Sequence, residues 1–464
     1  MLKLDLTLEE MCRILESEPV GVSSKNLKKK VRLCLDSREA AAGTVFFAIK
    51  GTRFDAHEFA PQVMKEGALM SVINSDQVEH LALEAYLPVS DTAEALLKLA
   101  KGYQRRFKLK KVAITGSNGK TTTKDMIKAV LSRKFNTHAT GGNLNNHIGV
   151  PVTLFQLKHS HEAAIIEMGT SGPNEIRPLS LATEPDVAVI TNIGASHLER
   201  LGTLDNVFKE KLSITAGLRS GGLLILNADD PRLCKVRSTK NYRVMTFGVR
   251  RGMFKPENLK WDENACAHFT MGRTKFELSV PGLHNLYNAL AAIAVGVSFK
   301  IPKSEIALAL KKFRASNMRM EVRRGKGFQI VADCYNANPS STKMALETIG
   351  NIENGSRRIA ILGDMLELGK DSKKLHYEIG RLVPEMNFDM LLAVGNDAEE
   401  FQKGARAGGL SADKALYFKT VAEVNEFLQD HVSRGDLILI KGSRGMKLEQ
   451  VLDFLLKQEP VLGE

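Results

Sequence analysis

The sequence has few cysteines, and none of them are close together. The five cysteines, Cys12, Cys34, Cys234, Cys266 and Cys334, are odd in number and scattered over the chain. They lack the short spacings of a metal site and the even count of a disulfide framework. This usage is typical of a protein in a reducing compartment, so we expect small buried thiols and a cytoplasmic location.

Long hydrophobic runs are also missing. No apolar stretch approaches the ~20 residues needed to cross a bilayer. The first twelve residues mix acidic with apolar side chains, unlike the core of a signal peptide. We therefore expect no membrane segment and no signal peptide. The 464 residues are 43% hydrophobic and 25% charged, which is typical of a packed protein, here of about three domains.

Excess positive charge is confined to the middle of the chain. The formal net charge is +12, and residues 106–312 contain 30 Lys and Arg against 16 Asp and Glu. Such a field suits anionic ligands such as ATP or nucleotide-linked substrates. Nucleic acid is the competing partner. The sequence has no zinc finger, RNP-type aromatic pattern or basic helix, so we expect no nucleic-acid partner.

The most informative stretch that is present is VAITGSNGKTTTKDMI, residues 112–127. It predicts a buried strand, a glycine loop and a helix that opens with Lys120 and Thr121. Such a loop binds phosphates through backbone N–H groups and the helix N-terminus, with the lysine on the outer phosphates and the hydroxyl on Mg²⁺. The loop is shorter than the common P-loop, and the alternative is a glycine-rich turn before an ordinary helix. We predict a nucleoside triphosphate site.

Strand and helix patterns alternate along the rest of the chain. The short apolar runs at 163–169, 186–194 and 222–230 are bounded by turn residues, which predicts a parallel sheet covered by helices. After a boundary near Phe313, further buried strands end in Gly, Asp or Asn and predict a second open α/β sheet. The first third alternates short strands and helices, including a helix over 57–68.

We therefore predict an α/β protein of three domains. A small mixed α/β N-terminal domain covers residues 1–105, and a central parallel-sheet domain with the P-loop covers residues 106–312. A Rossmann-like domain covers residues 313–464.

Several polar side chains follow the predicted central strands. Glu167 ends one strand and His197 follows the next. Strand ends beside a phosphate loop are where metal ligands gather, and Mg²⁺ prefers carboxylate oxygens. The alternatives are a solvated strand end and a structural histidine. Lys209 and Lys211 come shortly afterwards, and nothing local distinguishes either from a solvated helix face.

Other polar clusters are weaker indications of a functional site when each is considered alone. They are Asp36-Ser37-Arg38, the amide-rich loop at 141–151 with Asn145 and Asn146, the helix start His284-Asn285-Asn288, and the strand ends at 333–339 and 441–444. The amides could orient a substrate, and Lys-Gly-Ser-Arg after a buried strand suggests an anion site. A satisfied polar turn is the alternative for each.

Together these segments resemble the Mur ligases, ATP-dependent amide-forming enzymes of bacterial peptidoglycan synthesis. The resemblance covers nearly the whole chain, in order: Asp36-Ser37-Arg38, TGSNGKTTT, GNLNNHIGVP, EMG, HLE, HNLYNALAA, DCYNANPSS, LGDMLELG and KGSRGM. The YNANP and GDMLELG motifs favour the member that adds D-alanyl-D-alanine to UDP-MurNAc-tripeptide. Another Mur ligase or a folylpolyglutamate synthase is the nearest alternative, and a nucleic-acid-binding P-loop ATPase is a more distant one.

The resemblance also implies roles for residues. ATP would be bound by Gly116, Ser117, Asn118, Gly119, Lys120, Thr121, Thr122, Asn288, Arg319 and Asp333. Two Mg²⁺ ions would involve Thr121, Glu167, His197 and Lys211, with Lys211 carbamylated; Lys120, Glu167, His197 and Lys211 would be the catalytic set. Substrate contacts would come from Ser37 and Arg38 at the UDP end, and from Asn145, Asn146, Asn336, Lys441, Ser443 and Arg444. We expect a monomer.

Overall fold

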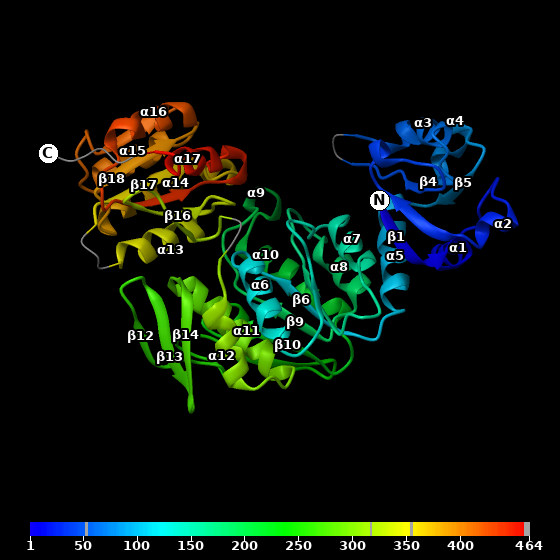
Figure 1. Cartoon of the computed structure of the whole chain (residues 1–464), viewed down its shortest axis with the longest axis horizontal. Coiled ribbons are helices and arrows are strands. Elements are labelled where there is room, and N and C mark those ends of the chain that lie inside the picture. The colour runs from blue at the N-terminus through cyan, green and yellow to red at the C-terminus, as the bar shows by residue number, and fades with distance from the viewer. Residues whose placement is uncertain (52–53, 316–317, 353–355, 459–464) are drawn as a thin grey trace.

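The computed structural model describes residues 1–51, 54–315, 318–352 and 356–458, which form three α/β domains in a row (Figure 1). The domains that contain the two termini lie at opposite ends, and the central domain lies between them. The predicted fold class is confirmed: a mixed N-terminal sheet is followed by a parallel central sheet and a mostly parallel C-terminal sheet.

The N-terminal domain is built on a five-stranded sheet in the order β1-β2-β3-β4-β5, in which only β1 and β2 are antiparallel. The strands are β1 (Leu2–Thr7), β2 (Lys30–Cys34), β3 (Val45–Phe47), β4 (Met70–Asn74) and β5 (Tyr86–Val89). The helices are α1 (Leu8–Leu15), α2 (Ser24–Leu27), α3 (Ala60–Lys65), α4 (Val78–Leu81) and α5 (Thr92–Gln104).

The helix predicted over residues 57–68 is wrong in its first turn. Asp55 accepts from the backbone N–H of His57 and begins a 3₁₀ turn, Ala56–Phe59. The α-helix α3 follows, with Pro61 in its first turn, where a missing N–H is tolerated. The Asp55 cap therefore favours a 3₁₀ turn here, where the hydrophobic periodicity predicts an α-helix.

Helix α5 joins the N-terminal domain to the central domain. Its buried face, with Leu96 and Leu99, belongs to one hydrophobic cluster that extends from Leu6 in β1 to Ile166 in the central sheet. Polar contacts at the end of α5 add to this, because Arg105 and Gln104 both donate to Glu184. The two domains consequently share a core.

The central domain contains a six-stranded, all-parallel sheet in the order β11-β10-β9-β6-β8-β7. Its strands are β6 (Lys110–Thr115), β7 (Thr137–Ala139), β8 (Ala163–Glu167), β9 (Val187–Ile190), β10 (Gly222–Asn227) and β11 (Tyr242–Phe247). Its helices are α6 (Lys120–Leu131), α7 (Gly149–Phe155), α8 (Ile176–Thr183), α9 (Leu198–Leu201), α10 (Leu204–Leu212), α11 (Leu283–Ser298) and α12 (Lys303–Lys312).

A three-stranded antiparallel sheet is attached to the central domain and was not anticipated. It consists of β12 (Glu257–Trp261), β13 (Cys266–Met271) and β14 (Thr274–Pro281), and it lies on the side of the C-terminal domain (Figure 1). β14 alternates buried and partly exposed residues, as expected for a sheet with one covered face. Because polar residues of the exposed face alternate with the apolar ones, the sequence has no continuous apolar run that would predict this strand.

The C-terminal domain has a six-stranded sheet in the order β15-β16-β20-β17-β18-β19, with only β15 antiparallel. The strands are β15 (Glu321–Arg324), β16 (Gln329–Asp333), β17 (Arg358–Gly363), β18 (Met390–Val394), β19 (Ala415–Phe418) and β20 (Leu437–Lys441). The helices are α13 (Pro339–Gly350), α14 (Ser372–Glu385), α15 (Glu399–Ala407), α16 (Val421–His431) and α17 (Glu449–Leu455). Within the described ranges, no helix is long and apolar enough to cross a membrane.

Candidate active site

The glycine loop lies between the end of β6 and the start of α6, as the sequence predicts. Gly119 precedes the helix in a left-handed conformation, φ 79°. A Cβ there would come within 2.4 Å of the Asn288 side-chain oxygen, and a Cβ on Gly116 within 1.8 Å of the Thr191 hydroxyl. Side chains are excluded at both positions, so the loop backbone stays open for a phosphate chain at the helix N-terminus.

The loop is held by the end of strand β9. The Ser117 N–H donates to the Asn192 carbonyl, and the Asn118 N–H donates to the Asn192 side-chain oxygen, both at 3.0 Å. The Thr191 hydroxyl donates to the Asn118 carbonyl at 2.6 Å. These bonds fix the loop before any ligand arrives, which reduces the ordering cost of binding.

Lys120 provides a partly buried cation at this loop. Its amine donates to the Gly116 carbonyl at 2.9 Å. Burial lowers the pKa of Lys120, and the carboxylate of Glu167 opposes that shift. A lysine held over the loop beside a carboxylate is suited to neutralise the charge of bound phosphates.

Glu167 is the carboxylate at the end of β8, the strand next to β6. Its Oε1 accepts from the Asn145 side-chain amide at 2.9 Å. Its Oε2 is buried and has no hydrogen-bond partner in the described structure. A buried, unpaired carboxylate oxygen next to a phosphate loop fits a hard cation such as Mg²⁺. The described residues contain no group of three or more His, Cys, Asp or Glu side chains that could hold a metal alone.

Lys209 and Lys211 occupy opposite sides of α10. Two positions apart on a helix differ by about 200° in direction, and Lys209 is exposed whereas Lys211 is only 1% exposed. Between them, the Glu210 carboxylate accepts the backbone N–H groups of Asn174, Glu175 and Ile176. That anchor fixes the rotation of α10 and directs Lys211 into the protein.

Lys211 has an unusual environment for a lysine. Burial lowers the pKa of Lys211 well below its ordinary value, and the charge of the neighbouring Lys120 lowers it further. No hydrogen-bond or ion-pair partner of its amine is found in the described parts of the chain. A buried lysine without a partner is costly unless its amine is neutral or modified.

His197 follows β9 and contacts the C-terminal domain. It precedes α9 in a left-handed backbone conformation, φ 51°. Its Nδ1 lies 2.7 Å from the Oε2 of Glu367, which comes from the segment after β17. The hydrogen bond from His197 lowers the pKa of Glu367, so this carboxylate is ionised near neutral pH.

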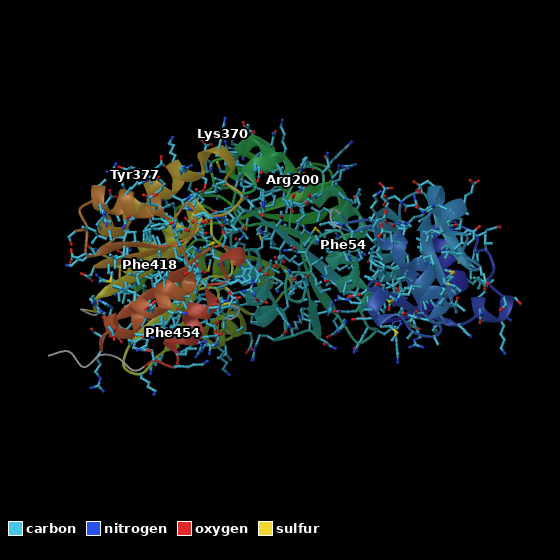
Figure 2. The ribbon with its side chains drawn as sticks, turned by 90° about the horizontal axis from the view of Figure 1, so that it is seen from above. Phe54, Arg200, Lys370, Tyr377, Phe418 and Phe454 are labelled. Atoms are coloured by element: carbon cyan, nitrogen blue, oxygen red, sulfur yellow. The ribbon has the colours of Figure 1, made fainter. Side chains whose placement is uncertain are left out.

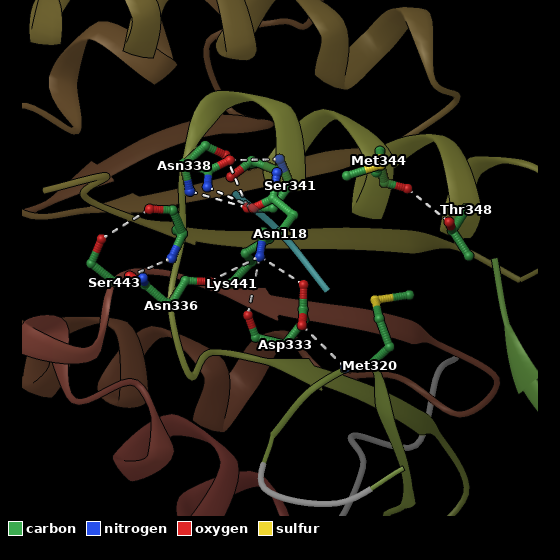
Figure 3. A network of polar contacts seen from close by, with 12 residues as sticks. Asn118, Met320, Asp333, Asn336, Asn338, Ser341, Met344, Thr348, Lys441 and Ser443 are labelled. Atoms are coloured by element: carbon green, nitrogen blue, oxygen red, sulfur yellow. Dashed lines mark hydrogen bonds and ion pairs between the residues drawn. The ribbon is translucent and has the colours of Figure 1, made fainter. Parts of the chain in front are cut away.

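The C-terminal domain faces the glycine loop with a polar network (Figure 3). The buried Lys441 amine at the end of β20 donates to Asp333 Oδ2 at 2.7 Å and to the Asn336 carbonyl at 3.1 Å. Asn338 donates from its side-chain amide to the Asn118 side-chain oxygen at 2.7 Å. The network therefore joins the strand ends of one domain to the phosphate loop of the other.

These elements enclose a cleft of about 620 Å³ between the central and C-terminal domains. The predicted site residues that line it are Ser117, Asn118, Gly119, Lys120, Thr121, Thr122, Asn145, Asn146, Glu167, His197, Asn288, Arg319, Asp333, Asn336 and Lys441. Gly116, Lys211, Ser443 and Arg444 are not part of the lining, and Ser37 and Arg38 lie in the N-terminal domain. The structure thus brings most of the predicted set together, while the role of each residue stays a prediction.

Some of the predicted site residues already make hydrogen bonds or ion pairs with other residues of the protein. The Asn288 amide accepts from the Thr123 hydroxyl and donates to Asn285, so its contact with a base would have to share these bonds. Arg38 pairs with Asp36 at 2.5 Å and is otherwise exposed. Ser443 accepts from the backbone N–H of Leu366 and supports the segment after β17.

Sequence reasoning assigned no individual role to Asp229, His284 or Tyr335, which all line the cleft. Asp229 accepts three backbone N–H groups from 249–251 and the Tyr287 hydroxyl. His284, whose pKa burial lowers to about 4, is neutral and lines the cleft. Arg319 stacks on Tyr335, with its guanidinium 4.0 Å from the ring centre. Tyr335 and His284 stood inside quoted motifs, but only folding brings them together.

Comparison with protein families gives three consecutive matches. The Mur ligase middle domain matches residues 114–296, the Mur ligase glutamate ligase domain matches residues 318–444, and the Mur ligase family catalytic domain matches residues 32–104. The three matched ranges correspond in order to the central, C-terminal and N-terminal domains described above.

Individual relatives match over almost their whole length. A UDP-N-acetylmuramoyl-tripeptide–D-alanyl-D-alanine ligase of Bacillus subtilis is 36% identical over 427 residues, covering 91% of this chain and 92% of the relative. Its Escherichia coli counterpart is 32% identical, covering 97% and 98%. Among solved structures, a MurF of Acinetobacter baumannii superposes with a TM-score of 0.88 at 31% identity, covering 98% of this chain and 100% of the other. A Thermotoga maritima MurF in complex with ADP gives 0.80 at 28% identity, covering 92% and 97%.

Proposed function

The chain belongs to the Mur ligase family, and from this premise we propose that it joins D-alanyl-D-alanine to UDP-N-acetylmuramoyl-tripeptide at the expense of ATP. The relatives with the highest identities described above have this activity in their names, and the chain spans at least nine-tenths of each. The observation that carries the proposal is the cleft itself. A phosphate loop with its lysine, Lys120, and a carboxylate with an unpaired oxygen meet there with polar groups of a second domain.

The reaction needs activation of a carboxylate. A carboxylate does not react with an amine near neutral pH, because its oxygen is a poor leaving group. Transfer of the ATP γ-phosphate to the tripeptide carboxylate gives an acyl phosphate; the dipeptide amine then attacks the acyl carbon, and phosphate leaves from the tetrahedral intermediate. Lys120 and the backbone N–H groups of 116–122 would bind the phosphates and offset charge on the transferring group.

The oxygen ligands present fit Mg²⁺, and we propose that Thr121 and Glu167 hold one ion, that Lys211 helps to organise a second ion, and that His197 lies at or near the metals. The unpaired Oε2 of Glu167 and the buried Thr121, which lines the same cleft, are the supporting observations. When bound, Mg²⁺ supplies charge neutralisation on the phosphate oxygens. Asn145 orients Glu167 from the other side by donating to its Oε1.

We further propose that Lys211 is carbamylated. CO₂ adds to the neutral amine, an N–C bond forms, and one proton is released, which leaves an anionic carbamate. The lowered pKa of Lys211 favours the neutral amine that this addition needs. The product places near Lys120 an anion with which the Lys120 cation can pair.

The remaining assignments are proposals as well. The N-terminal domain (1–105) would hold the UDP end through Ser37 and Arg38, while Asn146, Asn336, Ser443 and Arg444 would face the peptide substrates. Arg319, Asp333 and Asn288 would contact the nucleotide from the two sides of the cleft between domains 106–312 and 313–464. We propose that the protein acts as a cytoplasmic monomer without a nucleic-acid partner.

A coupled phosphate-release assay tests the function. ATP, UDP-MurNAc-tripeptide and D-alanyl-D-alanine together should give fast release, and omission of any one should abolish it. D-glutamate, diaminopimelate, or a folate with glutamate in place of the natural pair would reveal another ligase of the superfamily. ATP hydrolysis stimulated by DNA or RNA, without response to the muropeptide, would overturn the assignment.

A further inference from the structure

His197 is one of the points at which the site of the central domain meets the C-terminal domain. Its imidazole lines the cleft, whereas Glu367 approaches it from outside the lining and is itself 61% exposed. The distance between His197 Nδ1 and Glu367 Oε2 is 2.7 Å. In the described ranges the imidazole has no second hydrogen-bond or ion-pair partner.

This contact decides which ring nitrogen is free. An ionised carboxylate only accepts hydrogen bonds, so the nitrogen that faces it must carry the proton. In a neutral imidazole, Nδ1 then donates to Glu367, and Nε2 keeps its lone pair for the cleft. A carboxylate behind a histidine is a common way to fix the tautomer and ring orientation of a metal ligand.

The segment that carries Glu367 is held firmly by the C-terminal domain. After β17, the backbone N–H of Met365 donates to His376 Nε2, and that of Leu366 donates to the Ser443 hydroxyl, both at 2.9 Å. Glu367 then adopts a left-handed conformation, φ 64°. His197 is left-handed too, and such residues persist only where the surrounding structure imposes them, most often at functional sites.

The contact is part of a wider seam between the domains. A Cβ built on Gly369 would lie 3.9 Å from the Glu199 Cα, so this segment rests directly on the start of α9. The charge of Arg200 also acts on Glu367. Arg200 and Lys370 lie along the same edge of the molecule (Figure 2). An isolated surface ion pair contributes little to stability, so what this pair does follows from its position against the partly buried His197.

We propose that Glu367 is a positioning residue for His197, which it holds from the C-terminal domain with Nε2 toward the cleft. The candidate metal site of the central domain is then complete only while the C-terminal domain is docked. The inference rests on the proposed function and deepens it, because it gives a residue of one domain control over a ligand of the other.

Two measurements on the full chain test this role. Selective ¹⁵N-histidine labelling reports the tautomer of His197, with its signal assigned by its loss in His197→Gln. Mn²⁺ affinity, measured by electron paramagnetic resonance in the presence of ADP, reports the metal site without turnover. In Glu367→Ala the Nδ1–H signature should disappear and Mn²⁺ should bind about 10-fold more weakly, as is common when the carboxylate behind a histidine ligand is lost.

Two further variants separate positioning from general effects. Glu367→Gln keeps a side-chain oxygen that can accept from Nδ1–H, so it should retain the tautomer and most of the affinity. Asp371→Ala removes an exposed carboxylate from the same segment that makes no side-chain cap bond, and it should behave as wild type. Wild-type tautomer and affinity in Glu367→Ala, or equal losses in Asp371→Ala, would overturn the proposal.

The failure of this inference is distinguishable from failure of the proposed function. Absence of phosphate release in the wild-type assay sinks the ligase assignment whatever the NMR signal shows. Normal release together with an unchanged His197 signal in Glu367→Ala sinks only the positioning role.

Discussion

Two lysines on α10 illustrate how burial selects a reactive side chain. Lys209 is exposed and keeps ordinary solvent contact, whereas Lys211 is buried next to another cation. Their intrinsic chemistry is the same, so the difference comes only from the helix face that each occupies. The lowered pKa of Lys211 makes it the better candidate for addition of CO₂.

We predict that Lys211→Ala causes a severe loss of phosphate release that is partly restored by short carboxylic acids. A small carboxylate can occupy the space of the missing side chain and replace the carbamate charge. Lys209→Ala should be close to wild type, because this side chain points to solvent. Full activity of Lys211→Ala without an added acid would refute the carbamate.

Lys120→Ala should abolish activity while the fold stays intact. Loss of one positioned charge at a transferring phosphate typically costs at least about 100-fold in rate. Lys128→Ala is the matched control, because Lys128 is exposed on the same helix, α6. Turnover and far-UV circular dichroism are measured for both variants; near-normal turnover of Lys120→Ala would contradict the assignment of the loop.

A histidine in strand β7 contacts helix α7, and its protonation makes the stability of the fold depend on pH. His138 in β7 lies 3.0 Å from the Thr153 carbonyl in α7 and stacks on His161, with ring centres 5.0 Å apart. Burial lowers the pKa of His138 to about 4, from an ordinary value of 6.5. The unfolded chain therefore binds this proton more readily, and stability falls as the pH drops from about 6.5 toward 4.

We predict that His138→Gln reduces this sensitivity to acid. Wild type should lose about 1 kcal/mol more free energy of unfolding between pH 7 and pH 5 than His138→Gln does. This is less than the full pKa shift of His138 would give, because the imidazole is partly exposed. Urea unfolding at the two pH values measures it. The exposed His80→Gln serves as the control, and equal acid sensitivity of wild type and His138→Gln would show that other groups dominate.

The elements of the central sheet could be predicted because their signals are local. Buried strands such as 163–167 and the helix 283–298 carry apolar runs bounded by turn residues. The β12–β14 sheet could not be predicted, because its residues alternate between a covered and an exposed face and form no continuous apolar run. The 3₁₀ turn at Ala56–Phe59 could not be predicted either, because it depends on a single cap by the Asp55 carboxylate.

The three domains are joined in two different ways. The N-terminal and central domains share a hydrophobic cluster through α5. The apolar clusters of the C-terminal domain take only Ala265 from the central domain, and this domain meets the glycine loop through polar contacts, among them Asn338 to Asn118. Polar contacts exchange with water at little cost, so this second junction is the one suited to open and close around substrates.

Asn338 allows the junction to be tested separately from stability. Its side-chain oxygen caps α13 through the Ser341 N–H at 2.9 Å, while its amide donates to Asn118. Asn338→Ser keeps a good cap but loses the donor across the cleft. We expect unchanged urea stability and a KM for ATP raised about 5-fold, the equivalent of one net hydrogen bond.

Asn338→Ala is the companion variant, since it loses the cap as well. It should show the same rise in KM together with a loss of about 1 kcal/mol in stability. A KM for ATP in Asn338→Ser equal to that of wild type would show that the bond to Asn118 has no part in nucleotide binding.

The sequence by itself determined the α/β class, the alternation of strands and helices along the central and C-terminal domains, and the glycine loop, because these depend on neighbouring residues. It also placed Glu167 at the end of one central strand and His197 after the next strand along the chain; in the sheet these strands, β8 and β9, lie on either side of β6. Only the tertiary structure decided which lysine of α10 is buried and that Glu367 lies against His197. Such contacts join residues far apart in the chain, and their geometry depends on how whole domains pack, which no local pattern records.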